Sequence, residues 1–130
     1  MIAYLEASAA AKLLTREPEA EAVTRYLNEL VAKGDGLASS SLLETELRRA
    51  AFREGIAQAS VTALLDRVDV FDLERSMFTE AGIIPGRNLG SLDALHITAA
   101  LRMNADVVLT YDRRLSEAAE AAGLRVHSPA

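Results

Sequence analysis

The sequence has no cysteine and no apolar run long enough to cross a membrane. Without thiols, the chain can form neither a disulfide nor a thiolate metal site, so a reducing compartment is permitted. The N-terminus has no basic leader of the kind that opens a signal peptide. We therefore expect a soluble, unexported protein that is located in the cytoplasm and has no membrane partner.

Several common motifs are also missing. Neither G-x-x-x-x-G-K-[ST] nor G-x-G-x-x-G occurs, which disfavours the nucleotide-binding folds built on those loops. A receiver domain needs a lysine near the last strands, but the only lysines are Lys12 and Lys33. A phosphatase of the DxD type needs two aspartates after the first strand, where this chain has Glu6 and Ser8.

The 130 residues are 50% hydrophobic and carry a net charge of −5. This length fits one domain that can bury a sizeable core. The negative charge argues against a broad basic face that binds nucleic acid. A small basic patch remains compatible with the sequence, because arginines such as Arg113 and Arg114 are adjacent.

Short apolar strands alternate with amphipathic helices, which predicts an α/β fold with a mostly parallel sheet. The predicted strands are 1–8, 36–39, 68–73, 106–110 and 124–127. The predicted helices are 8–14, 17–33, 41–54, 56–67, 74–81, 91–103 and 113–122, and the one irregular loop is 83–90.

Local signals set the expected helix ends. Pro18 is predicted to open the helix over 17–33, whose apolar stripe runs from Val23 to Val31. Ser41 and Glu44 match a capping box, and Ser91 is predicted to cap the helix that follows it.

Two acidic residues lie at the exits of predicted strands. Glu6 ends the first strand and Asp112 comes directly after the strand over 106–110. Ligands of parallel sheets gather outside the carboxyl ends of the strands, so both carboxylates are candidate site residues. Asp112 could equally be the N-cap of the next helix, and one residue does not decide between the two interpretations.

Two further acids lie near the starts of helices. Glu46 shares the apolar stripe of Leu43 and Leu47, so its carboxylate faces inward and needs a partner, either an arginine or a cation. Asp93 lies in the first turn of a helix that is apolar almost all round, where the helix dipole alone would favour an acid. We interpret the neighbouring His96 as a hydrogen-bonded core histidine rather than a ligand or a base.

If these four carboxylates meet at one edge of the sheet, their mutual repulsion calls for a hard divalent cation with oxygen ligands. Mg²⁺ and Mn²⁺ are the natural candidates, and a cation of this kind supports chemistry on phosphodiesters.

Four motifs, taken in order, resemble the PIN-domain family, in particular the VapC-type ribonuclease toxins of bacterial toxin–antitoxin pairs. They are YLEAS, SLLETELRRA, LDALHITAA and LTYDRRL, and the ending AAGLRVHSP is similar as well. The resemblance covers essentially the whole chain. It implies a single PIN domain over residues 1–130, with a three-layer α/β/α architecture and a mostly parallel central sheet.

The same resemblance implies a function. Proteins of this family are endoribonucleases that bind Mg²⁺ or Mn²⁺, cut an RNA substrate, are neutralised by a cognate antitoxin and usually form a homodimer. By position, the resemblance gives the catalytic and metal-binding roles to Glu6, Glu46, Asp93 and Asp112, and supporting roles to Ser8 and Thr110.

One departure from the family pattern concerns Glu6, because the first acid of the family is almost always aspartate. The extra methylene would displace the carboxylate by about 1 Å, and such a displacement can cost on the order of 100-fold in rate. A natural weak variant and an engineered one both fit this departure. The alternative function is a PIN-like module that binds RNA or a protein without cutting, which Mn²⁺ titration would distinguish from a nuclease.

Overall fold

Strand β1 (Ile2–Leu5) lies at the centre of the sheet in this computed structural model, which describes residues 1–130. The five strands lie in the order β3-β2-β1-β4-β5, and every neighbouring pair is parallel. The α/β prediction is confirmed, and the sheet is wholly rather than mostly parallel. The other strands are β2 (Gly36–Ser40), β3 (Asp69–Phe71), β4 (Val107–Leu109) and β5 (Arg125–His127).

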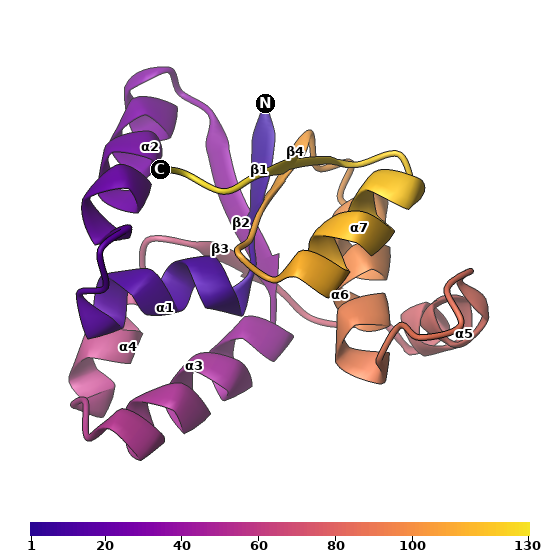
Figure 1. Ribbon diagram of the computed structural model, residues 1–130, viewed down its shortest axis with the longest axis horizontal. Coiled ribbons are helices and arrows are strands. Elements are labelled where there is room, and N and C mark those ends of the chain that lie inside the picture. Colours follow the sequence, from indigo (N-terminus) through magenta and orange to yellow (C-terminus); the bar gives the residue numbers. More distant parts are fainter.

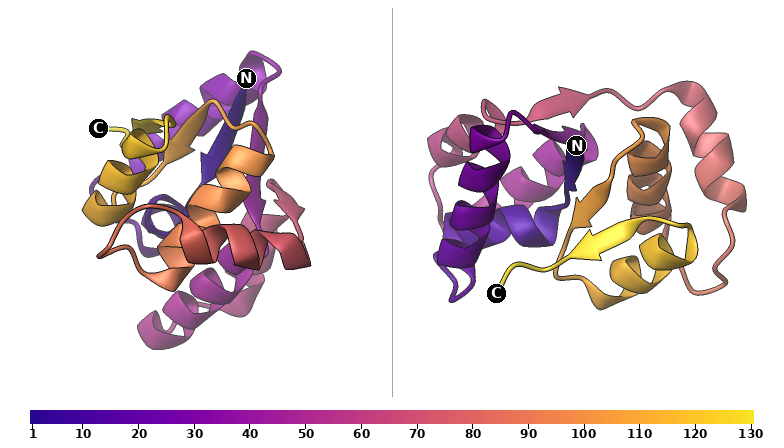
Figure 2. Two further views of the ribbon diagram at one scale, coloured as in Figure 1. Left: turned by 90° about the vertical axis from the view of Figure 1, so that its right-hand side faces the viewer. Right: turned by 90° about the horizontal axis from the view of Figure 1, so that it is seen from above.

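Helices cover both faces of this sheet, which gives three layers (Figures 1 and 2). Ala3 and Leu5 of β1 pack into one core with the first four helices, whereas Tyr4 points the other way and packs with the last three. This alternation is the two-residue period of a strand buried on both sides. The helices are α1 (Ala7–Thr15), α2 (Ala20–Ala32), α3 (Leu42–Glu54), α4 (Gln58–Leu65), α5 (Arg75–Ile83), α6 (Ser91–Arg102) and α7 (Arg113–Ala121).

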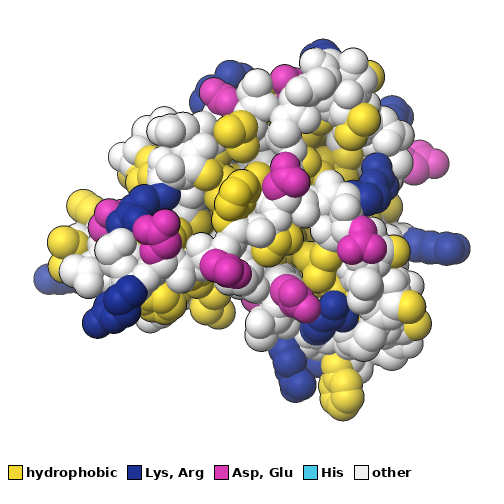
Figure 3. Space-filling model, turned by 180° about the vertical axis from the view of Figure 1, so that it is seen from behind, with side chains coloured by type: hydrophobic (Ala, Val, Ile, Leu, Met, Phe, Trp, Pro, Cys, Tyr) yellow, Lys and Arg dark blue, Asp and Glu magenta, His cyan; other side chains and the backbone are white.

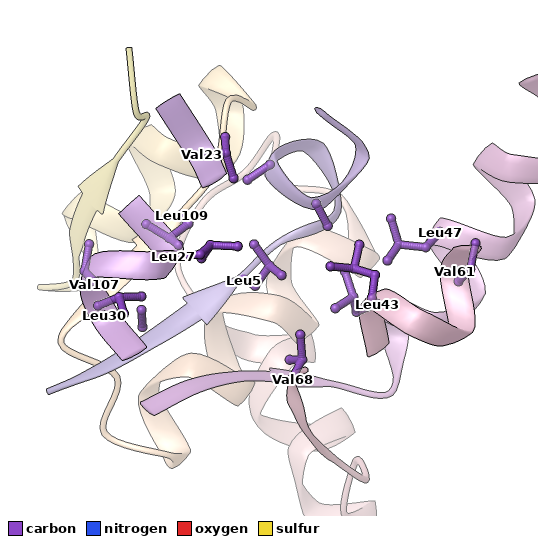
Figure 4. Packing of buried hydrophobic residues seen from close by; sticks show 14 of the residues in the cluster. Leu5, Val23, Leu27, Leu30, Leu43, Leu47, Val61, Val68, Val107 and Leu109 are labelled. Carbon is purple, nitrogen blue, oxygen red and sulfur yellow. The ribbon is translucent and has the colours of Figure 1, made fainter. Parts of the chain in front are cut away.

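The larger core joins strands β1 and β4 to helices α1, α2, α3 and α4 (Figure 4). Leu5, Leu43 and Leu109 are fully buried in it. Burial of each such side chain contributes about 1.5–3 kcal/mol relative to exposure, so this core anchors the ends of β1 and β4.

The strand order changes direction between β1 and β4. From β1 the chain builds outward through β2 to β3, whereas β4 and β5 lie on the other side of β1. Such a switch point leaves a crevice at the carboxyl ends of the two strands, which is where parallel sheets bind ligands. The residues that follow β1 and β4 are therefore placed for function.

Helix α2 begins later than the proline signal predicted. Pro18 and Glu19 form a turn and the helix starts at Ala20, while Gly34, with a φ of 74°, follows its end as expected. Val31 was assigned to the buried stripe but is 67% exposed. It lies eight residues after Val23, which rotates it by about 80° around the helix axis and away from the core.

Both predicted serine caps are wrong. Ser41 precedes α3 but makes no side-chain cap, because its φ and ψ of −60° and −16° are already helical rather than extended. Glu44 instead accepts a hydrogen bond from Arg48 Nε at 2.8 Å, the pairing expected four residues apart. In α6 the N-cap is Gly90, and Ser91 is the first helical residue.

Helix α6 is less completely buried than its composition predicted. Residues 94–100 are buried, but Leu92 and Leu101 are exposed at its two ends. None of the helices combines the length and apolarity needed to span a bilayer.

Candidate active site

Glu6 lies at the exit of β1 and joins that strand to β4. Its side chain is buried, and Oε1 accepts hydrogen bonds from Ser8 Oγ and Thr110 Oγ1, both at 2.5 Å. The two hydroxyls are themselves tied to the loop after β4, because Tyr111 N donates to Ser8 Oγ and Asp112 N donates to Thr110 Oγ1. The structure thus brings Glu6, Ser8 and Thr110 into direct contact at the predicted edge of the sheet.

Asp112 is the N-cap of α7. Its Oδ1 accepts a hydrogen bond from Leu115 N at 3.1 Å, so the N-cap interpretation of this residue is confirmed. The cap uses one carboxylate oxygen only. The same residue can therefore hold the helix and still present its other oxygen to a ligand.

Glu46 reaches from α3 to α6. Its Oε1 is 2.5 Å from His96 Nε2, and its side chain is 28% exposed. The inward orientation inferred from the apolar stripe is correct. Of the two partners considered, an arginine is absent and a buried histidine from another helix contacts Oε1 instead, while Oε2 accepts no hydrogen bond. His96 is the hydrogen-bonded core histidine that the sequence indicated.

Asp93 lies in the first turn of α6, and its side chain makes no hydrogen bond. Partial burial raises its pKa, and the negative charges of Asp112, Glu6 and, to a smaller degree, Glu46 raise it further, opposed by His96. These effects require all three carboxylates to lie within electrostatic range of Asp93. The fold therefore brings the other three predicted acids, which lie after β1, on α3 and before α7, within electrostatic range of Asp93 on α6, and we call this region of four acids the acidic site.

The acids have a common arrangement of used and free oxygens. Glu6, Glu46 and Asp112 are each anchored through one oxygen, and their second oxygens accept no hydrogen bond. Asp93 leaves both oxygens free. Four carboxylates with unbonded oxygens are the donor chemistry of a hard divalent cation.

The side chains offer suitable ligand atoms for a cation, but the distances between them are not those of a formed metal site. No three histidine, aspartate or glutamate side chains stand close enough together to hold a metal ion as they are. Repulsion keeps uncompensated carboxylates apart, and a cation removes that repulsion. The unbonded oxygens of the four acids are the atoms that would hold such a cation.

Two residues of this region, Tyr4 and Ser40, were not identified from the sequence. Tyr4 OH lies 2.6 Å from His96 Nδ1 and 2.9 Å from Ser40 Oγ. The available signal was the tyrosine in an otherwise aliphatic buried strand, since a buried phenol needs a polar partner.

The charge cluster makes a prediction for stability. Because the folded pKa of Asp93 is raised, the folded state holds its proton more tightly than the unfolded state, and stability is lost as pH rises from the unfolded pKa through the folded one. We expect Asp93→Asn to gain stability relative to the unmodified chain as pH increases through that acidic range. Denaturant unfolding at a series of pH values measures the difference, and parallel curves for the two proteins would contradict it.

A hollow of about 660 Å³ is lined by residues of β1, β2 and β3 and of helices α5 and α6. Its lining includes Ile2, Ala38, Asp69, Phe71 and Met77. Figure 3, which shows the molecule from behind, has acidic side chains spaced around apolar surface. None of the four acids lines this hollow, which is therefore separate from the acidic site.

Comparison with known proteins gives a consistent result. The PIN domain family model matches residues 3–121. The chain is 33% identical over 129 residues to Ribonuclease VapC46 of Mycobacterium tuberculosis, covering 97% of this chain and 96% of that protein. It is 35% identical over 133 residues to Ribonuclease VapC35 of the same species, with the same coverage.

The fold also matches solved structures. VapBC2 from Rickettsia felis, crystallised with a DNA fragment from its promoter, superposes with a TM-score of 0.80 at 20% sequence identity, over 100% of both chains. At that identity the likeness concerns the fold alone.

Proposed function

This chain belongs to the PIN-domain family, and on that basis we propose that it is a metal-dependent endoribonuclease and the toxin of a toxin–antitoxin pair. The single observation that carries the proposal is the acidic site at the β1–β4 switch point, where each anchored carboxylate keeps one unbonded oxygen. We propose that the whole chain, residues 1–130, acts as one PIN domain in the cytoplasm and forms a homodimer.

Glu6, Glu46, Asp93 and Asp112 would hold Mg²⁺ or Mn²⁺. When bound, such a cation activates water and neutralises charge that builds on the scissile phosphate. Ser8 and Thr110 fix Glu6, and Leu115 N fixes Asp112, so two of the acids are oriented before a cation arrives. The carboxylates repel the RNA phosphates unless a cation is present, which makes metal a condition of substrate binding.

Arginines near this site would hold the RNA backbone. Arg87 and Arg114 line a hollow of about 640 Å³ beside α7, together with Asn88 and one acidic residue, Glu117. Guanidinium groups bind phosphate in a bidentate manner. This local group provides a cationic contact that the net charge of −5 does not.

The experiment that tests the proposed function is incubation of the protein with total cellular RNA, with and without Mg²⁺, followed by mapping of new 5′ ends. We expect new ends at defined sequences that require the metal. RNA that stays intact in both Mg²⁺ and Mn²⁺, at protein concentrations that bind it, would identify a non-cutting binding module instead.

The antitoxin is expected to place a basic side chain in the acidic site. A site with four carboxylates attracts either a cation or a guanidinium, and an arginine there would block the metal, while an apolar segment packs against the early helices. Replacing that arginine with alanine should weaken the complex by at least about 30-fold. A complex in which the antitoxin lies wholly away from Glu6, Glu46, Asp93 and Asp112 would contradict this prediction.

A further inference from the structure

A chain of buried hydrogen bonds leads from the core of the molecule to Glu46. Ser40, at the end of β2, lies 2.9 Å from the hydroxyl of Tyr4 in β1. The same hydroxyl is 2.6 Å from His96 Nδ1, and His96 Nε2 is 2.5 Å from Glu46 Oε1. Ser40, Tyr4 and His96 are all buried, so water does not compete for the Ser40–Tyr4 and Tyr4–His96 contacts.

The chemistry of the partners fixes where the protons lie. A carboxylate oxygen accepts, so the contact assigns a hydrogen to His96 Nε2, which donates it to Glu46 Oε1. Nδ1 of the neutral ring is then an acceptor, and Tyr4 OH is the group in reach that can donate to it. A phenol carries its proton at neutral pH and is therefore able to donate it. Ser40 then donates to the Tyr4 oxygen, and every proton points toward Glu46.

We propose that His96 is a positioning residue for Glu46, set in one tautomer by Tyr4 and Ser40, so that Oε1 is anchored and Oε2 is left to bind the cation. This inference rests on the proposed function, because it assigns Glu46 to a metal site. Residues that hold metal ligands in this way typically contribute about 10- to 100-fold to metal affinity or activity.

Packing alone does not account for the chain of hydrogen bonds. Tyr4 and His96 contact each other edge to face within an otherwise apolar layer, where burying polar atoms costs free energy unless each one is hydrogen-bonded. A phenylalanine and a leucine would fill the same layer without that requirement. The polar pair adds a hydrogen-bond donor at the edge of the core, the N–H at His96 Nε2, and Glu46 Oε1 accepts that hydrogen bond.

The test measures Mn²⁺ affinity by isothermal titration calorimetry in four variants. We expect His96→Ala to weaken Mn²⁺ binding by about 10- to 100-fold. Tyr4→Phe removes the hydroxyl with little change of shape and should weaken binding less, and His96→Gln, which keeps an N–H donor, should recover part of the loss. Thr98→Val is the matched control, because Thr98 is buried on the same helix without contacting Glu46, and its affinity should stay unchanged.

A second readout needs no metal. Long-range proton–nitrogen NMR spectra of the metal-free protein at mildly alkaline pH should show His96 protonated at Nε2 and bare at Nδ1, with this preference weakened in Tyr4→Phe. Protonation at Nδ1 would overturn the inference even if the His96 variants failed to fold.

The outcomes separate the two proposals. Equal Mn²⁺ affinity in the unmodified protein and in folded His96→Ala would overturn the positioning role, and so would an absence of Mn²⁺ binding by the unmodified protein. If affinity falls as expected but no RNA is cut, the positioning role stands and the nuclease proposal fails.

Discussion

Replacing Asp93 or Asp112 with asparagine is expected to abolish RNA cleavage while the protein stays folded. Each change removes one negative charge and one ligand oxygen from the acidic site, and the loss should exceed the roughly 10- to 100-fold that follows removal of a residue supporting a ligand. The fold should survive for different reasons at the two positions. Asp93 makes no hydrogen bond, whereas at position 112 an asparagine oxygen can still cap α7 by accepting from Leu115 N.

Single-turnover cleavage of one RNA substrate at saturating Mg²⁺ measures the effect, and far-ultraviolet circular dichroism checks the fold. Asp66→Asn is the matched control, since it removes the same charge from an exposed position after α4 and should leave the rate unchanged. Unchanged cleavage in both Asp93→Asn and Asp112→Asn would remove these two residues from the mechanism.

Shortening Glu6 to aspartate is expected to raise Mg²⁺-dependent cleavage, by up to about 100-fold. Both supporting hydroxyls bind Oε1, so the position of the second oxygen depends on the length of the side chain. Mg²⁺ requires near-ideal octahedral geometry at about 2.1 Å, and a carboxylate displaced by one methylene meets that requirement poorly. Mn²⁺ is expected to tolerate the displacement better, so the unmodified chain should prefer Mn²⁺.

Glu46→Asp provides the opposite control for this prediction. It removes the same methylene from a carboxylate that must span from α3 to His96 on α6, so it should lower the rate. Cleavage by the two variants and the unmodified chain is compared in each metal. Equal Mg²⁺-dependent rates for the unmodified chain and the Glu6→Asp variant would show that Glu6 is a fully competent ligand or is not a ligand.

The sequence by itself determined the order in which strands and helices follow one another along the chain, and the placement of Glu6 and Asp112 after β1 and β4. These features depend on hydrophobic periodicity and on where a strand ends, and both are local properties of the chain. The inward orientation of Glu46 followed from the same periodicity, because its neighbours Leu43 and Leu47 are core residues.

Helix ends were harder to predict, because alternatives compete for the same groups. Glu44 had both a possible cap at Ser41 and a possible partner in Arg48, and the backbone angles of Ser41 decided in favour of Arg48. Val31 and Leu92 are apolar residues on amphipathic or apolar helices, yet both are exposed. Periodicity shows which side of a helix is apolar, but the neighbouring elements determine how much of that side is covered.

Only the tertiary structure decided which polar groups meet at the site. Glu46 and His96 are 50 residues apart, Tyr4 and His96 are 92 apart, and Ser8 and Thr110 are 102 apart. Each of these contacts depends on the order of strands in the sheet and on the packing of α3 against the α6 side of the molecule. No local pattern specifies those arrangements, because they arise from the burial of apolar surface across the whole chain rather than from any one segment.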